Sequence, residues 1–121
     1  MATIRIPSGS SADEINALIA ASQRDDTVLF AVGDYCPDKP LIWIRGRHYD
    51  GQGRELAERL AATIHGCNND VPCIDVVIDP QHPDPLLKVV TTGFDFPDGL
   101  LMRDIASDTI IIGNDAAFAA S

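Results

Sequence analysis

The chain has 121 residues, 45% of them hydrophobic and 22% charged, which fits a single globular domain over residues 1–121. Eighteen acidic residues against nine basic ones give a formal net charge of −9. Such a chain repels phosphate backbones and anionic lipid surfaces, so we expect neither nucleic acid nor a membrane as a partner. Solubility alone explains the acidic excess, and a basic protein partner is also compatible with it.

The N-terminus carries no recognisable targeting segment. Residues 1–11 contain one arginine and no long apolar stretch, and no apolar run in the chain approaches the roughly 20 residues needed to cross a bilayer. We therefore expect the complete product of one small gene, made in a cytoplasm.

The first half of the chain reads as strand, helix and two strands. Residues 2–6 form a short strand that ends at Pro7, and Ser11 and Glu14 have the spacing of a capping box before a helix over 12–22. Residues 27–32 and 41–44 are β-prone and are separated by a turn over 33–40. Because that connection is short, we expect the two strands to pair antiparallel.

The second half begins, after a possible strand over 47–49, with the clearest helical pattern. Leu56, Leu60 and Ile64 recur every four residues and predict a helix over 54–65. Strands follow over 74–78 and 86–91, which we expect to form a hairpin. The remaining segments are listed only briefly: an irregular stretch over 93–99, a strand or helical turn over 100–105, a strand over 109–112 and a weakly helical tail over 116–121.

The fold class that these elements predict is α+β, with two helices packed on a mostly antiparallel sheet of short strands.

Thiols and imidazoles were weighed as metal ligands. His65, Cys67 and Cys73 lie close in sequence, with Cys36 and His48 elsewhere. The two later cysteines are six residues apart, which is not the spacing of a zinc knuckle, so we expect no metal site. Reduced thiols are the default without a secretion signal, and a disulfide that closes the 67–73 loop stays open as an alternative under oxidising conditions.

Acid–base catalysis has candidate residues but no arrangement. Asp75, Asp79, Asp84, His82 and His48 could supply proton-transfer groups. Asp75 alternates with apolar neighbours and should lie on the solvent face of a strand, and His82 lies between prolines in an exposed loop. We expect these groups to be solvated, no residue to be catalytic and the chain not to be an enzyme.

The remaining motifs favour structural roles. The run Gly51-Gln52-Gly53 lacks the third glycine of a dinucleotide fingerprint and is interpreted as a turn, so we expect no cofactor. Trp43 lies in an apolar strand and should belong to the core. The charged face of the 54–65 helix is interpreted as solvated; it carries Arg54, Glu55, Glu58 and Arg59. No residue can be assigned to an interface.

Residues 41–92 resemble a small module of bacteriophage virion proteins, in which a helix is followed by two strands. The matching segments are the turn Tyr49-Asp50-Gly51, the alanine-rich helix over 55–64, and the strands 74–78 and 86–91. Gly113-Asn114 resembles the turn that closes that module.

Residues 4–53 resemble the N-terminal cap and first turn of right-handed parallel β-helix proteins, such as pectate-lyase-like enzymes and phage tailspikes. The matching segments are 6–11, the helix 14–19, the strand 27–30 and the run 47–53. The helix over 54–65 interrupts the expected coils, and the catalytic residues of those enzymes would lie in later coils, so none is carried over.

The two resemblances overlap in phage structural proteins. They imply a non-enzymatic virion component, either a capsid decoration or a tail or neck protein, made in the host cytoplasm and acting as a homo-oligomer or within a virion lattice. Two alternatives remain: a carbohydrate-binding or carbohydrate-cleaving β-helix fragment, and a small acidic inhibitor or immunity-type protein that binds a basic partner.

Overall fold

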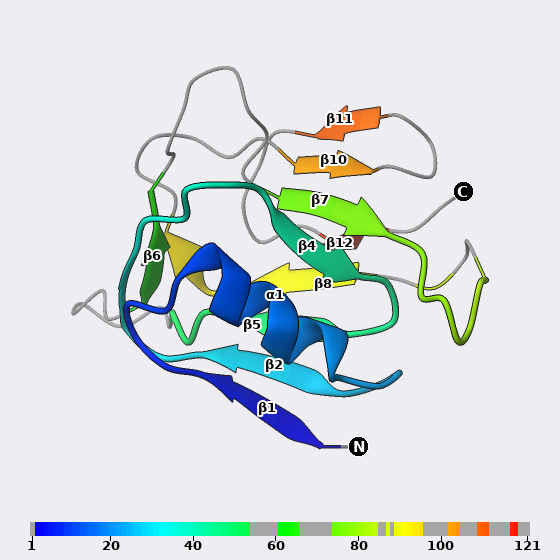
Figure 1. The fold of residues 1–121 in the computed structure, drawn as a ribbon, viewed down its shortest axis with the longest axis horizontal. Helices are drawn as coiled ribbons and strands as arrows, with labels where there is room; N and C mark the ends of the chain where they lie inside the picture. Colours follow the sequence, from blue (N-terminus) through cyan, green and yellow to red (C-terminus); the bar gives the residue numbers. More distant parts are fainter. Residues whose placement is uncertain are drawn as a thin grey trace.

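The computed structural model describes residues 2–53, 61–65, 74–84, 87, 89–95, 102–104, 109–111 and 117–118. Within these residues the chain forms one helix and twelve short strands (Figure 1). In chain order they are β1 (Thr3–Ile6), α1 (Ala12–Ala20), β2 (Thr27–Phe30), β3 (Gly33–Tyr35), β4 (Leu41–Ile44), β5 (His48–Asp50), β6 (Ala62–Ile64), β7 (Ile74–Val77), β8 (Val89–Thr92), β9 (Phe94–Asp95), β10 (Met102–Asp104), β11 (Thr109–Ile111) and β12 (Ala117–Phe118).

The strands form three sheets, which the chain visits in rotation. Sheet A has the order β1-β2-β5-β8-β12, sheet B has β3-β6-β9, and sheet C has β11-β10-β7-β4. The run β2-β3-β4 therefore passes once through A, B and C, and β5-β6-β7 and β8-β9-β10 repeat that path. Of the nine strand pairings among the described residues, seven are parallel. The chain winds as a parallel β-helix of three coils.

The spacing between paired strands varies from coil to coil. Thr27 of β2 pairs with His48 of β5, 21 residues later, whereas His48 pairs with Val90 of β8, 42 residues later. The strands keep register while the connections between them change length. A fixed sequence period is therefore absent, although the architecture is repetitive.

The inside of the coil is filled by every second residue of each strand, because successive side chains point to opposite faces of a sheet. Trp43 and Tyr49 are fully buried and stack with their ring centres 4.1 Å apart. Phe30 meets Phe94 edge to face at 5.1 Å. The Tyr49 hydroxyl donates to the carbonyl of Ile44 and accepts from the amide of the same residue, so the buried phenol is fully paired.

Helix α1 closes the first end of the coil, beside β1 and β4. Ser11 and Glu14 form the capping box that the sequence predicts, and Ile15 and Ile19 are fully buried beneath the helix. The Asn16 side chain accepts from the Ile42 amide at 2.8 Å. Since β4 is the last strand of its sheet, this contact satisfies a group that an open edge would leave exposed.

Glycines allow the corner between sheets A and B to stack closely. Gly93 has φ +73°, and a Cβ built there would lie 2.6 Å from the backbone nitrogen of Gly53. The amide of Gly53 donates to the Gly93 carbonyl at 2.8 Å. Consecutive coils therefore touch backbone to backbone at this corner, which leaves no room for a side chain.

The predicted fold class is wrong. The described part of the chain has one helix, and its sheets are mostly parallel, so two helices on an antiparallel sheet do not fit. The short connection over 33–40 does not form a hairpin, because β3 occupies it and turns the chain into sheet B. The strands β7 and β8 are likewise not partners, since β7 lies in sheet C and β8 in sheet A.

Two helical predictions also fail where they can be compared. Residues 62–64 form strand β6, paired with β3 and β9, although the periodicity predicted a helix over 54–65. Residues 54–60 of that helix lie outside the described residues. In the tail, residues 117–118 form β12, antiparallel to β8. Pairing with a neighbouring coil outweighs local helical preference at both places.

Candidate binding surfaces

The outer faces of the three sheets carry different side chains. In a coil, the residues that point outward are not needed to fill the core, so their chemistry is free to vary from sheet to sheet. The strand register identifies which outward residues lie beside one another.

The outer face of sheet A is polar. Arg5, Leu29, Asp50 and Thr92 lie opposite one another on β1, β2, β5 and β8. His48, one outward position earlier on β5, places Nε2 2.8 Å from the Thr92 hydroxyl. These residues form a continuous band across four strands.

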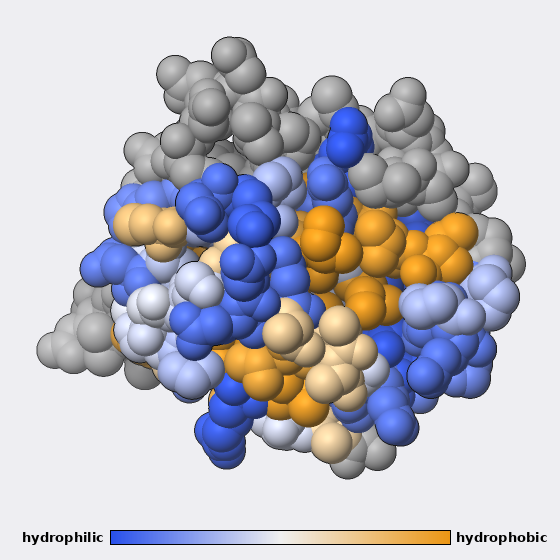
Figure 2. Space-filling view, viewed as in Figure 1, coloured by the Kyte–Doolittle hydropathy of each residue, from blue (hydrophilic) through white to orange (hydrophobic). Residues whose placement is uncertain are grey.

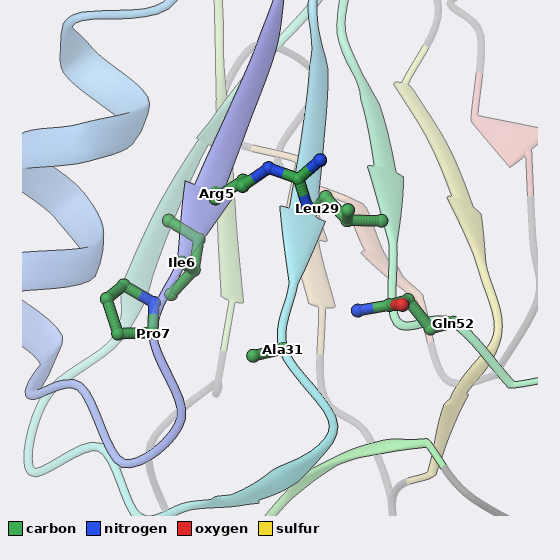
Figure 3. A pocket seen from close by; sticks show the side chains of 6 residues that line it. All are labelled: Arg5, Ile6, Pro7, Leu29, Ala31 and Gln52. Carbon is green, nitrogen blue, oxygen red and sulfur yellow. The ribbon is translucent and has the colours of Figure 1, made fainter.

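A shallow hollow of about 150 Å³ lies at the corner of this face (Figure 3). The Arg5 side chain crosses β2 toward Leu29, and Gln52 approaches from the opposite side. The remaining lining side chains are apolar and comprise Ile6, Pro7 and Ala31. The hollow is smaller than the roughly 300–1,000 Å³ typical of ligand pockets, so it has room for one group of a ligand rather than a whole one.

Gln52 is held in an uncommon conformation beside the hollow. Its φ is +66°, a region that L-residues other than Asn and Asp rarely adopt. Its backbone amide donates to Asp50 Oδ1 at 2.7 Å, and its side-chain amide donates to the Phe30 carbonyl at 2.7 Å. These two contacts fix the side chain against the end of β2 and leave its carbonyl oxygen near the hollow.

The outer face of sheet B is acidic. Asp34, Thr63 and Asp95 lie opposite one another on β3, β6 and β9, and both carboxylates are exposed. His65, which follows β6, places Nε2 3.1 Å from Asp34 Oδ1. Among the described residues this face offers negative charge with one imidazole beside it.

The outer face of sheet C is apolar. Ile42 and Ile44 of β4 and Val77 of β7 are its outward side chains, and Figure 2 shows hydrophobic atoms gathered over this part of the molecule, beside α1. Asp75 and Arg103 continue the row that Ile42 begins, and they form an ion pair with Nε 3.4 Å from Oδ1.

A charge-paired corner between sheets C and A is buried. The Arg47 guanidinium binds the Asp79 carboxylate and donates to the hydroxyl and carbonyl of Ser22 at 3.0 and 2.8 Å. Arg47 and Asp79 are only 4% and 2% exposed. Burial raises the pKa of Asp79, but hydrogen bonds from Arg47 and Gln81 outweigh it and hold the pKa below its ordinary value.

The residues weighed for catalysis are not brought together. His48 points outward from sheet A, Asp75 pairs with Arg103 on sheet C, and Asp79 is buried with Arg47. His82 and Asp84 lie in an exposed loop, as expected for His82. Trp43 is in the core, as predicted.

The candidate metal ligands that can be placed are also apart. Cys36 is exposed, while His48 and His65 belong to different sheets. Cys67 and Cys73 lie outside the described residues, as do the charged positions 54, 55, 58 and 59. Across the described ranges there is no group of three or more potential metal ligands, and no helix there is long and apolar enough to span a membrane.

Arg5, Gln52 and the outward residues of sheet C were not singled out from the sequence. Alternation within β4 and β7 marks Ile42 and Val77 as belonging to one face, but only the pairing of β4 with β7 brings them together. The positive φ of Gln52 had one signal, its place between two glycines.

Comparisons with protein family models, with characterised proteins and with solved structures find no match to this chain.

Proposed function

We propose that the chain is a non-enzymatic assembly protein that acts through protein–protein contacts, and that it serves as a component of a bacteriophage virion. In that role it decorates a capsid or belongs to a tail or neck, after synthesis in the host cytoplasm. The observation that carries the assembly role is the apolar outer face of sheet C, formed by Ile42, Ile44 and Val77. Contiguous apolar surface on a protein of net charge −9 favours contact with another protein.

The coil also suits a structural part. Three coils share one core, α1 closes one end, and the buried pair of Arg47 and Asp79 links residues 32 positions apart. Each coil supports the next, which gives a stiff element able to hold its outer faces in fixed relation.

The virion assignment rests on the resemblance of residues 4–53 to the start of β-helix proteins, tailspikes among them. The other resemblance, over residues 41–92, loses its support, because residues 62–64 form a strand where that module has a helix.

Particle association tests the proposal. An antibody raised against the purified chain should detect it in the phage particle fraction of a density gradient made from the producing culture, and mass spectrometry should find its peptides there. Detection only in the free-protein fractions, in a culture that releases particles, would refute the virion role.

Saccharide binding is a second candidate, and the hollow beside Arg5 and Gln52 favours it. A guanidinium, an amide and apolar side chains around one small depression suit a single sugar ring of a longer chain. Titration calorimetry with acidic and neutral oligosaccharides measures this. Arg5→Ala should abolish binding to an acidic saccharide, with Arg24→Ala, another exposed arginine, as the matched control. An unchanged affinity in Arg5→Ala would place any saccharide elsewhere.

A further inference from the structure

We propose that the outer face of sheet C is the surface through which two copies of this chain associate. The inference rests on the proposed assembly role and names the surface and the partner for it. The surface consists of Ile42, Ile44 and Val77, with the ion pair of Asp75 and Arg103 in the row that begins at Ile42. It is called the sheet C face below.

The sheet C face differs from the other two outer faces in what it loses by exposure to water. Sheet A presents an arginine, a histidine, threonines and an aspartate, and sheet B presents two exposed aspartates, all of which water solvates well. On the sheet C face, Ile42 and Val77 are half-buried aliphatic side chains, and they lie on adjacent strands. Covering this face removes apolar surface from water, whereas covering either of the others removes charge from water.

Charge identifies a second copy as the occupant. A chain of net charge −9 repels itself over most of its surface, so two copies can meet only where the local charge is balanced. On the sheet C face Arg103 neutralises Asp75, and near the start of β4 Lys39 neutralises Asp13 at 2.7 Å. The described residues therefore give this region no net charge.

A basic partner would favour a different face. The exposed carboxylates of Asp34 and Asp95 lie on sheet B and would attract positive charge, whereas the sheet C face offers such a partner no electrostatic gain. The inhibitor-type alternative thus predicts contacts on sheet B, and the two partners can be told apart by which face a substitution affects.

The geometry of a sheet face also suits self-association. Two sheets pack face to face with their side chains interdigitated about 10 Å apart, and a two-fold axis places the same patch on both sides. Each copy then sets its aliphatic side chains against those of the other, and both signs of charge lie beside them for mutual pairing. With few apolar anchors, the affinity should be roughly micromolar.

The test measures the mass of the full chain in solution by light scattering and sedimentation equilibrium, over about a thousandfold range of concentration centred on that affinity. We compare the unchanged chain with Ile42→Glu and Val77→Glu. Thr27→Glu is the control, because Thr27 is also half-buried and outward, on sheet A, and the substitution adds the same charge. Val77→Thr keeps the β-branched shape and reports on the apolar contact without adding a charge.

The unchanged chain and Thr27→Glu should form dimers with the same constant. Both glutamate variants should dissociate at least about tenfold more readily, because a carboxylate would be buried against apolar surface, and Val77→Thr should lie between them. Far-ultraviolet circular dichroism and thermal melting confirm that each variant is folded, and Val77→Thr keeps the test decisive if a glutamate variant is not.

Two results would overturn the inference. If the chain forms an oligomer that folded Val77→Glu and Val77→Thr leave intact, association uses another face, and the assembly role survives. If the chain stays monomeric over the whole range, two copies do not associate, and the particle fractionation described above decides separately whether the assembly role stands.

Discussion

Replacing Asp79 by asparagine should destabilise the protein strongly, although Asp79 lies far from every outer face considered above. The substitution keeps the shape of the side chain and removes its charge, so the Arg47 guanidinium stays buried without a counter-ion at hydrogen-bonding distance. Arg47 cannot turn toward water, because it also donates to the Ser22 carbonyl and to the Arg45 carbonyl at 2.8 Å each.

The expected loss is about 3–5 kcal/mol of unfolding free energy, as for other buried ion pairs that lose one partner. For a chain of this size that corresponds to a fall of roughly 10–20 °C in melting temperature. Urea denaturation followed by Trp43 fluorescence measures it, since Trp43 is fully buried and stacked on Tyr49.

The control is Asp95→Asn, which removes the same charge from an exposed position and should change stability by less than about 0.5 kcal/mol. A loss below about 1 kcal/mol for Asp79→Asn would contradict the reasoning, because Arg47 would then have to be solvated or otherwise compensated in the folded protein.

The same pair predicts a pH dependence. The folded pKa of Asp79 is lower than its ordinary value, so its stabilising contribution is fully present above the unfolded pKa of about 3.9. That contribution is lost as the pH falls through the lower, folded pKa. The melting temperature of the unchanged protein should therefore drop below about pH 4, and Asp79→Asn should show a shallower drop over that range.

Three further substitutions test other contacts. Gly93→Ala should cost several kcal/mol more than Gly9→Ala, since both glycines have φ near +75° but only the Cβ at Gly93 would meet backbone, and equal losses in thermal melting would contradict the close corner. Asn16→Ala should cost about 1 kcal/mol and speed amide exchange at Ile42, whose N–H would lose its acceptor. Tyr49→Phe should cost about 1–3 kcal/mol by leaving a buried amide unpaired, and a near-neutral melting temperature would show that water replaces the hydroxyl.

Local structure was predictable where a local cause produces it. The capping box at Ser11 and Glu14 and the apolar stripe behind it predicted α1 to within two residues, and alternation located β2, β4 and β7. The partners of these strands were not predictable in the same way. Thr27 pairs with a residue 21 positions on and His48 with one 42 positions on, so no period in the sequence announces the coil.

The helix predicted over 54–65 shows why. Ala62 and Ile64 are buried in β6, two positions apart, as the inward residues of a strand are. The same residues also fit a helical stripe with Leu56 and Leu60, and a short apolar run cannot distinguish the two periods. Pairing with β3 on one side and β9 on the other decides for the strand, and neither partner is near in sequence.

The candidate surfaces were hidden for a related reason, since each draws its residues from several coils. The sequence spaces Ile42 and Val77 35 residues apart, and the pairing of β4 with β7 places them on one face.

The arrangement of charge on the outer faces bears on why only one of them should be covered. On sheet B, Thr63 separates Asp34 from Asp95, so the two carboxylates lie two strand spacings, about 9.6 Å, apart. That distance is close to the Debye length at physiological ionic strength, and repulsion between the exposed carboxylates is largely screened. Sheet B therefore costs little when it faces water. The sheet C face has the opposite balance: its charges are already paired, and its aliphatic side chains gain only when another surface covers them.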